Sequence, residues 1–179
     1  MKQKVPATLT DQKIVSCTMT SEQQALWNAL DHFDLDDAQS ALTFSERLSR
    51  ENGWSLLFTL RCIEEYKRFI FLACVAGHPV TPSDEVDQVW HLHLLYTESY
   101  WIEMCQNILK KNIHHGPTKG GKQEDEKFTD WYARTKESYT RLFNQPPPID
   151  IWPSSEVRFK PANFQRINLD GKWIIKKLF

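Results

Sequence analysis

The chain has 179 residues with 22 basic and 23 acidic side chains, enough for one domain with a buried core and too few for two ordinary domains. The near-neutral balance excludes a strong overall field toward nucleic acid or anionic lipid. The longest apolar run, residues 69–76, falls far short of the roughly 20 residues that a membrane-spanning helix needs.

The N-terminal stretch MKQKVPATLTDQKIV lacks the apolar core of a secretory signal. The four cysteines are scattered along the chain. Cys62 and Cys74 share a predicted helix that holds them about 18 Å apart, too far for a disulfide bond. These features predict a soluble protein of the reducing cytoplasm.

Two short helices are predicted in the first third of the chain. Ser21 and Gln24 have the spacing of a capping box and predict a helix over residues 21–33. A second helix is predicted over residues 38–52, and it ends near Gly53, which tolerates a left-handed backbone conformation.

A third and stronger helix is predicted over residues 54–76. Its apolar positions recur at helical spacing and predict one buried stripe, made of Trp54, Leu57, Phe58, Tyr66, Phe69, Ile70 and Ala73. Two charged pairs four residues apart, Arg61 with Glu65 and Glu64 with Arg68, are predicted to support it.

The fourth predicted helix carries most of the histidines. Pro82 and Ser83, followed by acidic Asp84 and Glu85, are typical of a helix start, and the helix is predicted to continue to Lys111. Lysines at its end suit the helix dipole.

A fifth helix is predicted from the acidic stretch EDEK onward. Its aromatic and apolar side chains recur at helical spacing, at Phe128, Trp131, Tyr132, Tyr139, Leu142 and Phe143. The proline-rich stretch that follows cannot be helical, so an extended segment is predicted, with Ile151 or Trp152 inserted into a groove. Alternating apolar residues around Asp170 and Gly171 predict a small hairpin.

These elements predict a mainly α fold, a single-domain bundle of about five helices. Residues 1–20 are predicted to form an N-terminal arm, and residues 21–145 the helical domain. Residues 146–179 are predicted to hold the extended proline-rich segment and the C-terminal β-hairpin, both packed on the same domain.

Helical geometry separates His91 from His93. At about 100° per residue, their side chains point to opposite sides of a regular helix. His93 falls at the centre of the apolar face and is predicted to be buried and structural, or to contact a site from within. His91 lies one turn above Asp87, so the two side chains either pair with each other or offer a nitrogen and an oxygen to one metal ion.

The loop after this helix carries His114 and His115, and four of the six histidines lie between His91 and His115. The pair either caps the helix or joins His91 and Asp87 in a shared metal or acid–base site. The loop must fold back to do so, since it begins about 30 Å along a straight helix. The metal would be a divalent, zinc-like ion, although no cysteine pair or HExxH pattern specifies zinc.

Several stretches together resemble the bacterial branch of the glycine-rich domain-containing protein-like family. They are EYKRF, VTPSDEVDQVWHLHLLYTESYW, HHGPTKGG, DWYARTKESYTRLF and PPIDIWP, and they span roughly residues 54–159. The resemblance implies a soluble protein and names no reaction. Its matched motif positions are Asp87, Trp90, His91, His93 and His114. Plant relatives carry a long glycine-rich segment, whereas this chain has six glycines in total, and the resemblance assigns no role to His115.

Two classes of function fit these observations. In the first, the protein is a binding or scaffolding module built around the His, Asp and aromatic cluster, and Pro146–Pro153 or the basic C-terminus meets a protein partner. In the second, it is a metal-dependent, hydrolase-like enzyme that uses Asp87, His91 and a loop histidine, with Glu98 as a nearby acid or base. No clear signal for nucleic acid or for a membrane accompanies either one.

Overall fold

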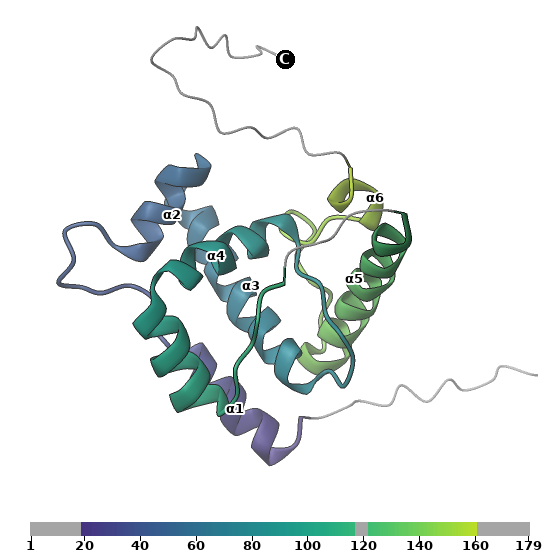
Figure 1. Cartoon of the computed structure of the whole chain (residues 1–179), viewed down its shortest axis with the longest axis horizontal. Helices are drawn as coiled ribbons and strands as arrows, with labels where there is room; N and C mark the ends of the chain where they lie inside the picture. Colours follow the sequence, from purple (N-terminus) through teal and green to yellow (C-terminus); the bar gives the residue numbers. More distant parts are fainter. Residues whose placement is uncertain (1–18, 117–121, 161–179) are drawn as a thin grey trace, which may run out of the picture.

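Helix α3 lies at the centre of the fold, and four other helices pack against it (Figure 1). The structure is a computed structural model and describes residues 19–116 and 122–160. The described residues form seven helices, which are α1 (Ser21–Asp31), α2 (Phe44–Asn52), α3 (Leu56–Val75), α4 (Asp84–Leu95), the π-helix η1 (Glu98–Leu109), α5 (Lys122–Phe143) and α6 (Ser155–Arg158). The predicted mainly α fold is confirmed, and the predicted hairpin falls in residues 161–179, outside the described part of the chain.

A capping box opens α1, one residue earlier than predicted. The Thr20 hydroxyl accepts a hydrogen bond from the Gln23 backbone N–H at 3.2 Å, and the Gln23 side chain accepts one from the Thr20 backbone N–H at 3.0 Å. The predicted box at Ser21 and Gln24 is therefore wrong by one residue. The reciprocal bonds satisfy two backbone donors that the first turn would otherwise leave free.

Helix α2 is shorter than predicted and begins with a second capping box, formed by Thr43 and Glu46. The predicted start at residue 38 is wrong because Asp37 instead closes a turn, in which its side chain accepts hydrogen bonds from the Gln39 backbone N–H and the Ser40 hydroxyl. The predicted end is confirmed, because Gly53 adopts a left-handed conformation with φ of 68°.

The buried side of α3 forms much of the core. Its fully or nearly fully buried apolar side chains are Cys62, Ile63, Tyr66, Phe69, Ile70, Phe71 and Leu72. The predicted stripe is wrong at Leu57, whose side chain is 74 % exposed, and its neighbours Leu56 and Leu60 are exposed as well. The period of a helix assigns side chains to faces, but it does not say how far along the helix the neighbouring elements cover a face.

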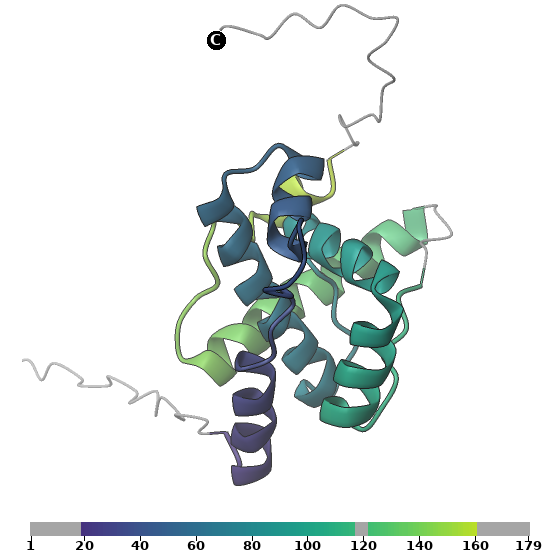
Figure 2. The same ribbon diagram turned by 90° about the vertical axis from the view of Figure 1, so that its left-hand side faces the viewer.

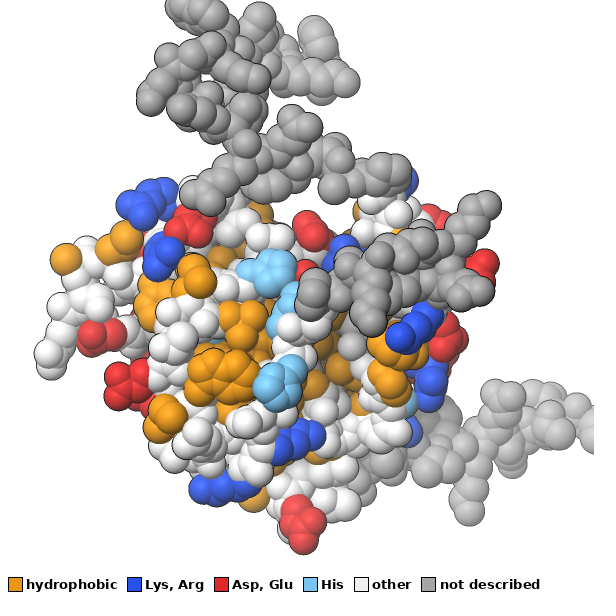
Figure 3. Space-filling view, viewed as in Figure 1, with side chains coloured by type: hydrophobic (Ala, Val, Ile, Leu, Met, Phe, Trp, Pro, Cys, Tyr) orange, Lys and Arg blue, Asp and Glu red, His pale blue; other side chains and the backbone are white. Residues whose placement is uncertain are grey.

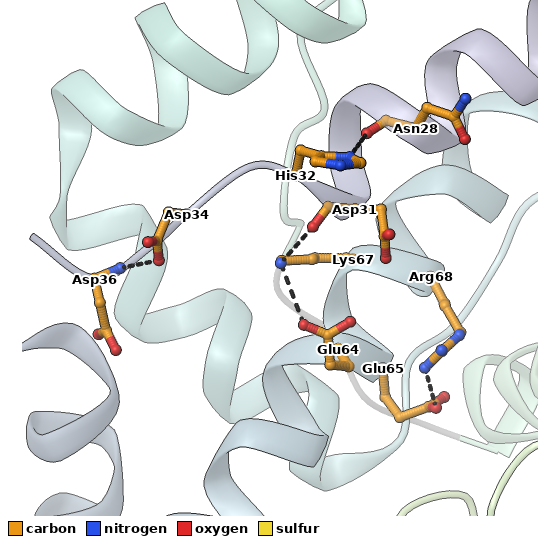
Figure 4. Close-up of polar contacts among 9 residues, drawn as sticks. All are labelled: Asn28, Asp31, His32, Asp34, Asp36, Glu64, Glu65, Lys67 and Arg68. Carbon is orange, nitrogen blue, oxygen red and sulfur yellow. Dashed lines mark hydrogen bonds and ion pairs between the residues drawn. The ribbon is translucent and has the colours of Figure 1, made fainter.

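The two predicted ion pairs on α3 are wrong. The Arg61 guanidinium makes two hydrogen bonds of 2.6 and 2.8 Å to the Asp150 carboxylate instead of pairing with Glu65. Arg68 pairs with Glu65 at 2.7 Å and not with Glu64 (Figure 4). In both cases a better-placed carboxylate in the folded chain replaces the pair expected from spacing alone.

Lys67 ties α3 to the end of α1 (Figure 4). Its ammonium donates to the backbone carbonyl of Asp31 at 3.0 Å and to the Glu64 carboxylate at 3.2 Å. Asp31 is the last residue of α1, so the cation meets a carbonyl that lacks a partner within the helix and lies at the negative end of the helix dipole.

The fourth predicted helix does not continue to Lys111, because the chain breaks it at Tyr96. This residue has φ of −91° and ψ of 69°, and η1 begins two residues later. Neither glycine nor proline marks the break, so tertiary contacts set it. The Tyr96 ring packs edge-on against Phe44 at 5.3 Å, and His93 Nε2 lies 3.2 Å from the Ser99 hydroxyl across the break.

The break changes the direction of the chain. After η1, Lys110 takes a left-handed conformation with φ of 55°, and residues 110–116 then run back beside η1 toward α4 (Figures 1 and 2). The loop that follows the helix is therefore brought back to α4, as a shared histidine site requires.

A buried carboxylate joins α3, α5 and the proline-rich segment. Glu65 accepts hydrogen bonds from the Trp152 indole N–H at 2.8 Å and from the Tyr139 hydroxyl at 3.1 Å. Burial raises the pKa of Glu65, while Arg68 and these donors oppose the rise. Ile151 and Trp152 are both buried, which confirms that the segment inserts apolar side chains into the domain.

The proline-rich segment is not extended throughout. It turns at Pro148, whose carbonyl accepts hydrogen bonds from the backbone N–H groups of Ile151 and Trp152, and the short helix α6 follows.

The described cysteines, Cys62, Cys74 and Cys105, are free thiols. None of the helices described combines the length and the apolar composition that a membrane span requires.

Candidate functional site

Helix α4 presents Asp87 and His91 on the same side. The helix begins at Asp84 because the Ser83 hydroxyl caps it by accepting the Val86 backbone N–H at 3.2 Å. Acidic side chains in its first turn suit the positive end of the helix dipole. The Asp87 carboxylate and the His91 imidazole then lie 3.8 Å apart, one turn from each other, as their spacing predicts.

His115 completes a group of three side chains. Its Nε2 atom lies 2.8 Å from Oδ1 of Asp87, and its ring centre lies 4.6 Å from that of His91. Because a carboxylate only accepts hydrogen bonds, Nε2 of His115 carries the proton in this contact. The nearest donor atoms of Asp87, His91 and His115 all lie within 4.8 Å of one another.

The Asp87 carboxylate is the centre of the group. Its Oδ1 atom faces His115, and its Oδ2 atom faces His91. The Asp87 side chain is 18 % exposed and that of His115 is 21 % exposed, whereas the His91 side chain is 49 % exposed. The donor atoms of Asp87 and His115 are thus partly shielded from solvent, whereas the His91 ring is exposed enough to change its rotamer.

One carboxylate and two imidazoles form a donor set that zinc-like divalent ions accept. A tetrahedral zinc ion with ligands at 2.0–2.1 Å holds them about 3.4 Å apart. The Asp87–His115 contact of 2.8 Å and the Asp87–His91 contact of 3.8 Å lie on either side of that value. A rotamer adjustment of His91 would bring its nitrogen toward bonding distance, and binding at Nε2 of His115 would require that ring to adopt the tautomer that is protonated at Nδ1.

His93 lies apart from this group, on the buried side of α4, as its helical position predicts. Its side chain is fully buried; Nδ1 lies 2.8 Å from the Tyr66 hydroxyl and Nε2 lies 3.2 Å from the Ser99 hydroxyl. Burial lowers the pKa of His93 to about 4, so the ring is neutral at pH 7. His93 is thus the link between α3, α4 and the start of η1.

His114 and Glu98 are also outside the group. His114 is exposed, and its ring packs against that of Trp101 at a centre-to-centre distance of 5.5 Å. Glu98, the expected acid or base, is the exposed first residue of η1. The structure therefore selects His115 as the loop histidine that meets Asp87 and His91.

Histidine surface lies across the middle of the face shown in Figure 3, along α4 and the segment that follows η1, beside a hydrophobic area. The exposed apolar side chains of α4 and η1 are Leu95, which is 64 % exposed, and Ile102, which is 44 % exposed. Leu95 is one helical turn beyond His91, so it lies on the same side of α4.

The contacts that hold His115 in place were not predicted from the sequence. The His115 ring packs edge-on against Trp90 at 4.5 Å, and the Trp90 indole N–H donates to the Tyr100 hydroxyl at 2.9 Å. The Tyr100 hydroxyl in turn donates to the backbone carbonyl of Ile113. On the predicted helix Tyr100 falls on the same apolar face as His93, and the sequence carries no local signal for a bond from its hydroxyl to a loop carbonyl.

Comparison of the chain with protein-family models, with curated proteins and with solved structures gives no match.

Proposed function

We propose that this protein is a metal-binding module in which Asp87, His91 and His115 hold one zinc-like divalent ion. The observation that carries this proposal is the proximity of the three donor atoms, which all lie within 4.8 Å of one another. Two of the donors belong to α4 and the third to the segment that follows η1. A bound ion would therefore fasten that segment to α4.

The bound ion would keep a coordination position open. Zinc is most often four-coordinate, and three protein ligands leave one position for water or for a donor group from another molecule. The half-exposed His91 places this position toward solvent. The exposed Leu95 one turn further along α4 supplies an apolar surface beside it. These features fit a module that binds a partner side chain or small ligand through the ion.

A metal-dependent hydrolase is the second candidate. The same open position would hold a water molecule, and a zinc-type ion lowers the pKa of bound water enough to generate hydroxide near neutral pH. The three-ligand donor set favours this candidate. Glu98, in contrast, lies outside the group of donors, and for this reason the binding function is preferred.

Metal titration tests the proposal. Purified protein freed of metal by chelation is titrated with Co²⁺ followed by its visible absorption, and with Zn²⁺ in competition. We expect one ion per chain in the wild type and in His114→Ala, and loss of at least tenfold in affinity in His115→Ala. The two histidines are neighbours in sequence, so the pair controls for changes in the loop.

Two results would overturn the proposal. One is a wild-type protein that binds neither ion at micromolar concentrations. The other is an affinity that His115→Ala leaves unchanged. Hydrolysis of nitrophenyl esters and phosphates by the Zn²⁺-loaded wild type, compared with His115→Ala, separates the enzyme from the binding module.

The family resemblance and the partner surfaces add to this proposal. The resemblance to the glycine-rich domain-containing protein-like family stays a prediction. Its motif includes Asp87, His91 and His114, whereas the loop histidine close to Asp87 and His91 is His115. Within Pro146–Pro153, Ile149 is 80 % exposed and offers an apolar contact for a protein partner. The basic C-terminus, the other predicted partner surface, lies largely outside the described residues.

A further inference from the structure

The position of His115 depends on how residues 110–116 are fastened to the helices. The segment leaves η1 at Lys110, and the Lys111 ammonium donates to the backbone carbonyls of Ala73 and Cys74 at the end of α3, at 3.3 Å each. His115 lies four residues further on and offers one donor atom to the site. A segment of this length needs a second point of attachment to hold an imidazole in one place.

Tyr100 of η1 supplies that second attachment. Its hydroxyl donates to the backbone carbonyl of Ile113 and accepts the Trp90 indole N–H at 2.9 Å. The side chain of Tyr100 is fully buried, and Trp90 is 6 % exposed, so the bond between these two side chains is shielded from water. The buried Cys105 thiol also contacts the Tyr100 hydroxyl and the Ile113 backbone.

Trp90 connects this attachment to the metal site itself. It follows Asp87 by three residues on α4, and its ring lies edge-on to that of His115 at 4.5 Å. The Trp90 indole therefore packs against the His115 imidazole, and its N–H donates to the Tyr100 hydroxyl. That hydroxyl in turn binds the Ile113 carbonyl, two residues before His115. Asp87, His91 and Trp90 come from one stretch of α4, whereas His115 belongs to the segment that Tyr100 fastens to η1.

We propose that Tyr100, together with Trp90, is a positioning residue of the metal site, which holds the His115 imidazole within reach of Asp87 and His91 before an ion binds. This inference rests on the metal binding proposed above and extends it to residues that touch no ion. Groups that orient metal ligands lower affinity by about 10- to 100-fold when they are removed. The metal affinity falls because residues 110–116 gain conformational freedom without this attachment, and metal binding must then order them again at a cost in conformational entropy.

The test replaces the two hydroxyls that make the same kind of bond. Tyr100→Phe removes the bond to the Ile113 carbonyl, and Tyr132→Phe removes a bond of 2.9 Å from a fully buried tyrosine to the Pro153 carbonyl, away from the site. We expect Tyr100→Phe to weaken Co²⁺ and Zn²⁺ binding about 10- to 100-fold, and Tyr132→Phe to change it less than about twofold, although both variants lose a hydroxyl bond to a backbone carbonyl. Tyr100→Phe also loses the bond from the Trp90 N–H, which is part of the same attachment. Equal effects of the two substitutions on affinity, or no effect of Tyr100→Phe, would overturn the inference.

A second readout does not require metal. In the metal-free wild type, the Nε2 proton of His115 that bonds to Asp87 is expected to give a slowly exchanging imidazole signal in the NMR spectrum. We expect this signal to be lost or to exchange faster in Tyr100→Phe and to persist in Tyr132→Phe. If the wild type binds no ion, the proposed function fails, and an unchanged signal in Tyr100→Phe would separately overturn the positioning role.

Trp90→Phe covers the case in which Tyr100→Phe does not fold, as judged by circular dichroism. It keeps an aromatic ring against His115 and removes the N–H that Tyr100 accepts. The same loss of affinity and of the imidazole signal is expected, and a variant that matches the wild type in both would contradict the inference.

Discussion

The Nε2 atom of His115 lies 2.8 Å from Oδ1 of Asp87, although 28 residues of chain separate the two side chains. The other oxygen of the same carboxylate faces His91 at 3.8 Å. A single aspartate thus connects a histidine one turn away on its own helix with a histidine on a segment that returns from the far end of η1.

Asp87 should therefore be the most sensitive carboxylate for metal binding. We expect Asp87→Asn to lower Zn²⁺ affinity by more than about tenfold. Removing a group that only orients a metal ligand already costs about 10- to 100-fold, and Asp87 is proposed to bind the ion directly. Asp84→Asn is the matched control, since Asp84 is also in the first turn of α4 but lies 3.6 Å from Arg158. Isothermal titration calorimetry of both variants checks the expectation, and a comparable loss in Asp84→Asn would argue against a site centred on Asp87.

Metal binding should also stabilise the folded chain. At a free Zn²⁺ concentration 100 times the dissociation constant, the free energy of unfolding rises by about 2.7 kcal/mol if the unfolded chain does not bind the ion. We expect this stabilisation to disappear on adding a chelator and to be absent in His91→Ala. His32→Ala is the control, because His32 is bonded to the Asn28 carbonyl at the end of α1. Thermal unfolding with and without Zn²⁺ measures the effect, and stabilisation that survives in His91→Ala would place the ion elsewhere.

His93 predicts an acid-dependent loss of stability. Its pKa is lowered by burial to about 4, below the ordinary value of 6.5, so the unfolded chain binds a proton between these values that the folded chain excludes. Stability from this group is therefore complete above pH 6.5 and is lost as the pH falls toward 4. The expected loss between pH 7 and pH 5 is about 2 kcal/mol.

The variant His93→Gln isolates this contribution, since glutamine does not titrate. Urea unfolding at pH 7 and pH 5 is expected to show a smaller pH dependence in the variant than in the wild type. His93→Gln should also be less stable at pH 7, because it disturbs the bonds to Tyr66 and Ser99. An identical pH dependence in the two proteins would mean that the buried ring takes up a proton as readily as a free one.

The buried Glu65 carboxylate predicts a large effect of a conservative change at Trp152. Trp152→Phe keeps an aromatic ring in the core but removes the indole N–H that Glu65 accepts at 2.8 Å. Leaving a buried carboxylate oxygen without this donor is expected to cost about 1–3 kcal/mol, measured by urea unfolding. Trp54→Phe, at a partly buried indole that packs on Phe58 at 5.4 Å, should cost less. Equal costs would show that lost packing, rather than the bond to Glu65, dominates.

The sequence was sufficient for the main helices and for the sides of α4 on which Asp87, His91 and His93 lie. The periods of α3, α4 and α5 determined the mainly helical fold and most of the buried faces. The same local geometry separated the exposed His91 from the buried His93 and placed Asp87 beside His91. These predictions need only the angle and rise per residue, which are the same in every regular helix.

The tertiary structure decided which loop histidine meets Asp87. That choice depends on the break at Tyr96, on the reversal at Lys110 and on the bond from Tyr100 to the Ile113 carbonyl, and none of these has a glycine or proline to mark it. Residues that are neighbours in sequence, such as His114 and His115, make different contacts in the folded chain, and the family resemblance included His114 where the geometry favours His115. The exchange of the predicted Arg61–Glu65 pair for Arg61–Asp150 has the same origin, because partners from distant segments compete with local ones only after the chain has folded.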